Sequence, residues 1–333
     1  MDPGAVLLAL LGSANLSSRR IVYEQYDSIV QSRTVRRPEE ADAAVLALPD
    51  GSALGVAIDG NGRRVAADPY EGTIAAVLEC AANLACVGAE PLGVTNNLNF
   101  GNPEKPHIAW QLTEAVRGLG DACRALGVPV TGGNVSLYNE GGAGPIYPTP
   151  VIGMVGRLPD ATRAGRLGFA RAGDAIALAG WSAAPALGAS ELAKLWGEPL
   201  PDGLPATDLA RARAVLEAVR DAVRAAALSS CHDVAEGGVL VAVAECCLAG
   251  GLGAALDLGS RGDAWSSLFG ELPAGFVVSG RPEALEQLAR AVPLDVLGTV
   301  GGDTLQVTVA GESASWTLAE LREAHQALGR FFP

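Results

Sequence analysis

The sequence predicts a mixed α/β protein of two domains. Its 333 residues suffice for two domains with proper cores. Short apolar runs of strand-like composition alternate with longer segments of helical periodicity. A second series of this kind opens with a strand at residues 173–179, after a polar stretch at 158–166. We therefore expect a helix and linker at 1–20, a first domain at 21–157 and a second at 158–333.

The most informative stretch covers residues 94–139, where two polar turns flank a helix. One apolar strand enters an Asn- and Gly-rich turn at 96–106, and a second enters Gly132-Gly133-Asn134. Residues 107–126, between the turns, have helical spacing. A strand–helix–strand unit brings both turns to one edge of a sheet. Their amide, hydroxyl and backbone N–H groups suit a phosphate-bearing ligand with its metal. Gly-Gly-Asn is, however, also common in turns that bind no ligand.

Composition excludes several classes of protein. The formal net charge of −13 argues against a nucleic-acid partner, because basic residues gather only at 33–37 and 63–64. No window of eighteen apolar residues indicates a membrane span. Residues 1–11 lack the basic start of a signal peptide, so we expect a short amphipathic helix there. Six cysteines without a Cys-x-x-Cys pair fit buried, reduced thiols in a cytoplasmic protein without a zinc site.

In the first domain, the runs 43–48 and 53–58 predict a hairpin closed by Pro49-Asp50-Gly51. A strong helix is expected from Thr73 to Val87, and a last strand at 151–156. Glu79 and Asn83 are four residues apart on that helix and share one face. They form either a solvated polar stripe or a metal or phosphate face, and the second interpretation needs another carboxylate from elsewhere.

In the second domain, we expect a surface loop at 197–205, an amphipathic helix at 209–227, strands within 294–309 and a final helix at 316–328. A strand ending at Cys231 leads into a long apolar helix that begins near Gly237. Asp233 and Glu236 have the spacing of a helix capping box. Alternatively, Asp233 is a metal carboxylate and His232 its positioning neighbour.

Five strings carry a resemblance to a known family. They are YEQYD (23–27), DPYEG (68–72), LNFGNPEKP (98–106), GNVSLYN (133–139) and HDVAEGG (232–238). In this order they resemble the C-terminal half of the large (synthetase) subunit of phosphoribosylformylglycinamidine synthase, in the aminoimidazole ribonucleotide synthetase-like superfamily. The likeness spans almost the whole chain.

The resemblance implies an α/β (α+β) fold whose N-terminal domain forms half of a dimeric β-barrel and whose C-terminal domain is an α/β sandwich. It implies half of an ATP-dependent, cytoplasmic ligase of de novo purine biosynthesis. That enzyme converts formylglycinamide ribonucleotide and ammonia from glutamine to the amidine. The implied partners are the N-terminal synthetase half, fused or separate, a glutaminase subunit and a small bridging subunit. An isolated chain would be a homodimer.

The resemblance also implies roles for individual residues, with ATP or ADP and Mg²⁺ as cofactors. Asn96 and Gly133 would bind ATP, Asn134 would ligate Mg²⁺ and Ser136 would bind the ribonucleotide substrate. A second, relic cleft would hold Mg²⁺ through four residues, namely Asp42, Glu79, Asn83 and Asp233. An amide or carboxylate oxygen suits a hard cation, and a glycine lets phosphates approach the backbone.

Four features depart from the family pattern. Asn96 stands where relatives usually carry Asp, Ala82 where most carry Arg, and 268–276 lacks the usual Ser-Gln and Arg. The segment 59–64 has no counterpart of the catalytic histidine, so we expect no catalytic residue in this half. One alternative is a degenerate, nucleotide-holding half with a structural or dimerising role, which is favoured by the relic-cleft residues retained beside the altered Asn96. A homodimeric thiamine-phosphate or selenophosphate enzyme is a third, which the strings containing Asn99 and Ser136 disfavour.

Overall fold

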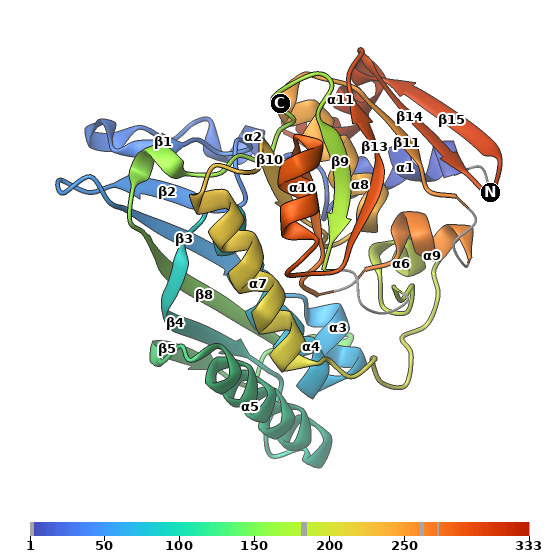
Figure 1. Ribbon diagram of the computed structural model, residues 1–333. Coiled ribbons are helices and arrows are strands. Elements are labelled where there is room, and N and C mark those ends of the chain that lie inside the picture. The colour runs from blue at the N-terminus through green and yellow to red at the C-terminus, as the bar shows by residue number, and fades with distance from the viewer. Residues whose placement is uncertain (1–2, 181–184, 260–262, 272, 333) are drawn as a thin grey trace.

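The computed structural model describes residues 3–180, 185–259, 263–271 and 273–332, which form two β-sheets with helices packed between and around them (Figure 1). The first sheet has the strand order β1-β2-β3-β8-β4-β5. Its strands are β1 (Thr34–Arg36), β2 (Ala44–Ala47), β3 (Ala53–Asp59), β4 (Glu90–Asn99), β5 (Val130–Ser136) and β8 (Thr149–Leu158). A small hairpin, β6 (Glu140–Gly141) with β7 (Gly144–Pro145), follows β5. The predicted hairpin at 43–58 is confirmed, since β2 pairs antiparallel with β3.

Among the described residues, helices cover one face of the first sheet and leave the other without a helix. The helices of this domain are α2 (Arg20–Tyr23), α3 (Gly62–Ala67), α4 (Pro69–Cys86) and α5 (Pro106–Leu126). α4 is apolar almost all round because it lies between the sheet and other helices, and α5 has one apolar face. The two helices approach closely at Gly118, where a Cβ atom would come within 2.4 Å of the Tyr70 carbonyl oxygen.

The other face of the first sheet is open and partly apolar. Strand alternation turns Val45, Ala53 and Ala57 toward the helices, whereas Val56 and Ile58 point away from them. Ile58 is 73% exposed, and Leu46, Val56 and Val155 are also exposed. The sheet does not close on itself within the described residues, since β1 and β5 are its edges. Such a face favours association with another sheet.

We expect the isolated chain to form a homodimer at about micromolar concentration through this open face, because pairing two such faces removes apolar surface from water. Ile58→Lys should shift it to monomer, as measured by light scattering. Val296→Lys is the matched control, since Val296 is 59% exposed on the other sheet. A monomeric wild-type chain would contradict this expectation, as would equal disruption by both substitutions.

The second sheet has the order β10-β12-β9-β13-β11-β14-β15. Its strands are β9 (Ala175–Ala179), β10 (Ser230–Asp233), β11 (Ala254–Asp257), β12 (Phe276–Gly280), β13 (Leu294–Val300), β14 (Thr304–Val309) and β15 (Glu312–Thr317). The helices around it are α1 (Pro3–Leu11), α6 (Glu191–Leu195), α7 (Leu209–Arg224), α8 (Gly238–Gly250), α9 (Ala264–Phe269), α10 (Pro282–Leu288) and α11 (Leu318–His325). Its central strands are buried on both faces, so they are almost continuously apolar.

One hydrophobic core joins the two sheets. It contains residues of α4 and the first sheet together with Ala177, Phe276 and Val278 from one face of the second. α7 lies between the sheets and packs on α4 and α5 (Figure 1). A second core lies on the opposite face of the second sheet, where α8 packs with α1 and α11. The contact between α4 and β10 places residues from distant parts of the sequence together.

Several sequence-based boundaries differ from the structure. α4 begins at Pro69 rather than Thr73, because the Asp68 carboxylate accepts hydrogen bonds from the backbone N–H groups of Tyr70 and Glu71. The last α-helix spans Leu318–His325, since Trp316 still belongs to β15. None of the helices described is long and apolar enough to cross a membrane.

The capping role considered for Asp233 and Glu236 is wrong. α8 starts after Gly237, which adopts a positive φ of 86° and provides no side-chain cap. Asp233 is instead the last residue of β10 and is buried. The Gly237 N–H group donates to the Glu271 carboxylate at 2.9 Å, so the partner at this helix start comes from a remote loop.

Candidate functional site

Strands β4 and β5 align the residues predicted to bind ATP, its metal and the substrate. The parallel register pairs Asn96 with Gly133, Asn97 with Asn134, and Asn99 with Ser136. A Cβ atom on Gly133 would lie 2.6 Å from the Asn96 carbonyl oxygen, so only glycine fits this close approach. Four of the predicted site residues therefore lie on two neighbouring strands: Asn96 on β4, and Gly133, Asn134 and Ser136 on the edge strand β5.

Side-chain hydrogen bonds hold this edge in place. Asn134 Nδ2 donates to Asn97 Oδ1 at 3.2 Å. The Asn139 amide donates to the Ser136 hydroxyl at 3.1 Å and to the Phe100 carbonyl oxygen at 3.1 Å, which fixes the turn after β5. β5 itself is exposed from Val130 to Val135. The result is an ordered, polar and solvent-accessible strand edge.

A second cluster forms around Asp59, at the end of β3. Its carboxylate is hydrogen-bonded to Glu79, and Asn83 Nδ2 lies 3.5 Å from its Oδ2 atom. Glu79 and Asn83 therefore project from α4 toward a carboxylate from another element, which excludes the solvated-stripe interpretation. Glu236 approaches the cluster and accepts a hydrogen bond from Asn61 at 2.6 Å.

Asp233 extends this cluster toward a third group of side chains. Ligand atoms of Asp42, Cys86 and Asp233 all lie within 4.8 Å of one another. Asp42 Oδ1 is 2.5 Å from His232 Nδ1, and Glu245 Oε2 is 3.0 Å from His232 Nε2. Asp42 Oδ2 is buried and has no hydrogen-bond partner among the described residues. An unpaired buried carboxylate oxygen is a position where a cation would be stabilising.

Burial and mutual repulsion disfavour the charged forms of these carboxyl groups. Burial, followed by repulsion from Glu236, raises the pKa of Asp59 to about 7. Burial and the nearby carboxylates raise the pKa of Glu79 and of Asp233 well above the usual range, although Glu79 keeps some exposed surface. For His232, burial lowers the pKa, but Asp42 and Glu245 outweigh it and raise the pKa well above its usual value. A divalent cation would relieve the repulsion.

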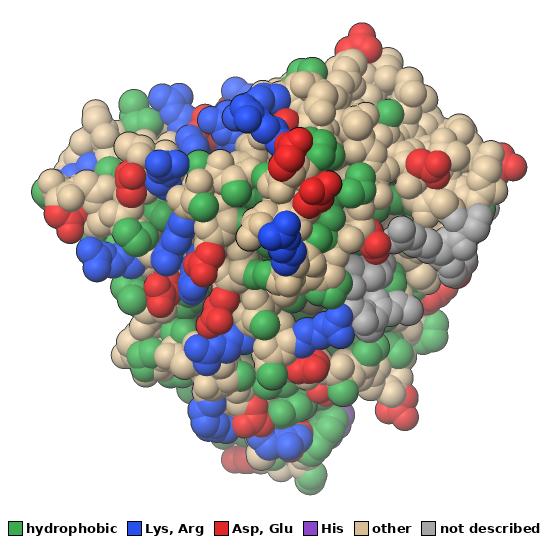
Figure 2. All heavy atoms as spheres, viewed as in Figure 1, with side chains coloured by type: hydrophobic (Ala, Val, Ile, Leu, Met, Phe, Trp, Pro, Cys, Tyr) green, Lys and Arg blue, Asp and Glu red, His purple; other side chains and the backbone are tan. Residues whose placement is uncertain are grey.

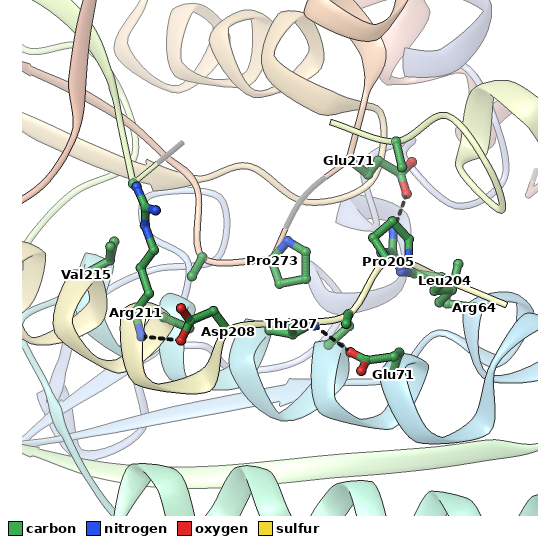
Figure 3. A pocket seen from close by; sticks show the side chains of 16 residues that line it. Arg64, Glu71, Leu204, Pro205, Thr207, Asp208, Arg211, Val215, Glu271 and Pro273 are labelled. Atoms are coloured by element: carbon green, nitrogen blue, oxygen red, sulfur yellow. Dashed lines mark hydrogen bonds and ion pairs between the residues drawn. The ribbon is translucent and has the colours of Figure 1, made fainter. Parts of the chain in front are cut away.

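A cavity of about 240 Å³ adjoins the acidic cluster and is largely apolar. It lies between α4, α7, the loop at 204–208 and the segment that follows α9 (Figure 3). Arg64 and Glu271 line both this cavity and the smaller hollow that contains Glu79, Asp233 and Glu236. Arg64 Nη1 lies 3.2 Å from Glu271 Oε2, while its buried Nε atom has no partner among the described residues.

The structure divides the eight predicted site residues into two places. Asn96, Gly133, Asn134 and Ser136 lie on β4 and β5, whereas Asp42, Glu79, Asn83 and Asp233 belong to the acidic cluster. The acidic cluster has two parts. In one part, Asp42 and Asp233 lie beside Cys86. In the other, Glu79 and Asn83 lie beside Asp59.

Sequence reasoning missed Asp59, Glu236, Glu245 and Glu271 as members of the site. The sequence predicts Asp59 only as part of a turn without a histidine. A carboxylate at the end of a strand, directly before a Gly-Asn-Gly turn, is the signal that could have identified it. Glu245 and Glu271 lie inside or after apolar helices, and only tertiary packing brings them to the cluster.

The two sheets correspond to two known domain families. Residues 40–158 match the AIR synthase related protein N-terminal domain, and residues 171–330 match the C-terminal domain. The chain therefore belongs to the AIR synthase related protein family, and the expected α/β fold of that superfamily is confirmed.

Its curated relatives are phosphoribosylformylglycinamidine synthase subunits named PurL. The chain is 46% identical to the Moorella thermoacetica protein over 323 residues, covering 94% of this chain and 43% of the relative. It is 42% identical to the Brucella ovis protein over 332 residues, covering 98% and 44%. The resemblance to this synthase family is confirmed, and the chain spans less than half the length of these relatives.

Solved structures show the same fold at lower identity. The Thermotoga maritima PurL structure described as complexed with FGAR superimposes with a TM-score of 0.76 at 18% identity. That match covers 95% of this chain and 52% of the other. At this identity the likeness establishes the fold alone.

Proposed function

We propose that this chain is the nucleotide- and substrate-binding half of an ATP-dependent phosphoribosylformylglycinamidine synthase of purine biosynthesis. The carrying observation is the β4–β5 register, which pairs Asn96 on β4 with Gly133 on the exposed edge strand β5, where Asn134 and Ser136 also lie. Curated relatives at 42–46% identity support this proposal. So do the names of T. maritima PurL structures with FGAR, ADP and ATP.

In this proposal the open edge is one wall of the reaction site. Gly133 lets nucleotide phosphates approach the backbone, the Asn134 amide oxygen ligates Mg²⁺ and the Ser136 hydroxyl binds the ribonucleotide. Mg²⁺ neutralises charge on the transferring phosphoryl group. Asn96 retains hydrogen-bonding capacity without the carboxylate charge. The N-terminal synthetase half, fused or separate, supplies the acid–base group. A glutaminase subunit, assembled with a small bridging subunit, supplies ammonia in the cytoplasm.

A second nucleotide position is proposed at the acidic cluster. Asp42, Glu79, Asn83 and Asp233 would hold Mg²⁺, and Asp59 adds a carboxylate to that set. The donors are the hard oxygens that Mg²⁺ prefers, and a cation would be stabilising beside the buried, unpaired Asp42 Oδ2 atom. The adjoining 240 Å³ cavity is apolar enough to take part of a nucleotide base. A structural role of this half, with a permanently held nucleotide, is the second candidate function.

Thermal unfolding in the presence of Mg²⁺ and ADP separates the two positions. Ligand at about 100 times its Kd stabilises the native state by about 2.7 kcal/mol and raises Tm accordingly. If the acidic cluster holds the nucleotide, Asp233→Asn should remove most of this shift, because it removes a central carboxylate. Asn134→Ala should remove it instead if the β4–β5 edge holds the nucleotide.

The control is Asp257→Asn, on an exposed residue of β11. Its carboxylate accepts a hydrogen bond from the Gly259 N–H group, and the amide oxygen of asparagine preserves that bond. The nucleotide-dependent shift should therefore be unchanged. A full shift in both Asp233→Asn and Asn134→Ala would contradict both positions, and no shift in the wild-type chain would contradict nucleotide binding by this half alone.

A further inference from the structure

A groove of about 380 Å³ lies at the junction of the two domains, apart from both positions described above. It is bounded by β1, the connection from β8 to β9, the end of α7 and the start of β10. Four arginines line it, namely Arg36, Arg163, Arg166 and Arg171. Figure 2 shows Lys and Arg side chains gathering over β1 and the neighbouring region toward β10. In a chain with a formal net charge of −13, this concentration of positive charge is unusual.

The positive charge in the groove is poorly compensated. No acidic residue is among the described residues that line it. The side chains of Arg166 and Arg171 are exposed and make no hydrogen bond or ion pair with any part of the chain that the structure describes. Arg163 has only a distant partner, with 3.9 Å between its Nε atom and Asp160 Oδ2.

Arg36 anchors the groove. Its guanidinium donates to the backbone carbonyl oxygens of Gly165 at 2.8 Å and Ala164 at 2.6 Å. Burial, and then repulsion from Arg166, lower the pKa of Arg36, while Glu40 acts in the opposite direction. The guanidinium of Arg36 is therefore held in place beside other arginines that lack acidic partners, and a bound anion would stabilise this arrangement. The Ser229 hydroxyl adds a neutral hydrogen-bonding group to the lining.

We propose that this groove binds a small molecule carrying a phosphate or diphosphate group, held mainly by Arg36, Arg166 and Arg171. Arginine binds phosphate oxygens in a two-pronged geometry, and the larger negative charge of a phosphate or diphosphate favours it over a carboxylate beside several uncompensated cations. The volume lies within the range of about 300 to 1,000 Å³ that small-ligand sites occupy. The site is independent of the proposed ligase function and needs no metal.

Titration calorimetry with inorganic pyrophosphate tests the site directly. The measurement is made at low salt with EDTA, so that binding through Mg²⁺ at the acidic cluster does not contribute. We expect saturable binding of one pyrophosphate per chain, weakened at least tenfold by Arg166→Glu and less by Arg166→Lys, which keeps the charge. Higher salt should weaken it, because the groove is open and its charges are screened. Asp233→Asn should leave it unchanged.

The matched control is Arg290→Glu, a charge reversal at an exposed arginine outside the groove. It should bind pyrophosphate like the wild-type chain. Arg171→Glu provides a second groove variant if Arg166→Glu lowers Tm in the absence of ligand. Equal affinity in groove and control variants would overturn the proposal. Pyrophosphate binding that does not saturate would also overturn the proposal. The same holds if an acidic peptide binds to the groove and pyrophosphate does not.

Discussion

The purified chain alone should show no ATP- and ammonia-dependent amidine formation, and adding a separately produced N-terminal synthetase half should restore turnover. The reason is that the loop between Asp59 and Arg64 contains no histidine, and the β4–β5 edge is open on one side. General acid–base groups contribute about 10²- to 10⁴-fold in rate. The measurement is steady-state product formation with ammonium, with and without the partner half.

In the reconstituted enzyme, Ser136→Ala should raise the KM for the ribonucleotide more than that for ATP, because we propose that its hydroxyl binds the ribonucleotide. Ser315→Ala, on an exposed residue of β15, is the control and should change neither constant. Turnover by the isolated chain would show that it carries a complete catalytic site. An increase in the KM for ATP alone would assign Ser136 to the nucleotide.

Without Mg²⁺, the chain should be more stable at pH 5.5 than at pH 8. The pKa values of Asp59 and Glu271 are each raised to about 7, in both cases chiefly by burial. Between the unfolded value near 4 and about 7, the native state therefore binds more protons than the unfolded state. The free energy of unfolding then falls as pH rises, by about 1.4 kcal/mol per pH unit for each such group.

This pH effect is measured by urea unfolding at a series of pH values. Glu79→Gln should make the free energy of unfolding depend less steeply on pH. It should also stabilise the chain at pH 8, because it removes one buried charge. Saturating Mg²⁺ should flatten the slope, since the cation replaces the bound protons. Glu320→Gln is the control, because the pKa of Glu320 is lowered by its hydrogen bonds with Thr317 and it titrates below this pH range. Stability that rises from pH 5.5 to 8 would contradict the prediction.

Local sequence was sufficient where local interactions determine the structure. The hairpin at 43–58 and the helix after Pro106 follow from strand alternation and helical periodicity, and the structure contains both. The predicted start of α4 at Thr73 is four residues late, because Asp68 caps the helix and Pro69 fits its first turn. An Asp followed by Pro is a helix-start signal that the sequence itself contains.

The candidate sites show a sharper division. Glu79 and Asn83 share a face of α4 because of helix geometry alone, and the sequence determined this pairing. Their contact with Asp59 depends on how β3 packs against α4, and the cluster of Asp42, Cys86 and Asp233 depends on the packing of β10 against α4. The β4–β5 register likewise became definite only in the sheet.

The sequence by itself determined the family and the order of strands and helices, because motifs and periodicity are properties of neighbouring residues. Only the tertiary structure decided which carboxylates share a buried site and which arginines share a groove. Asp233 has the spacing of a helix cap, yet it is buried among acidic groups from both domains. Arg36 and Arg166 are 130 positions apart, yet they line one groove. Charges interact through space rather than along the chain, so their energies depend on packing that no local pattern contains.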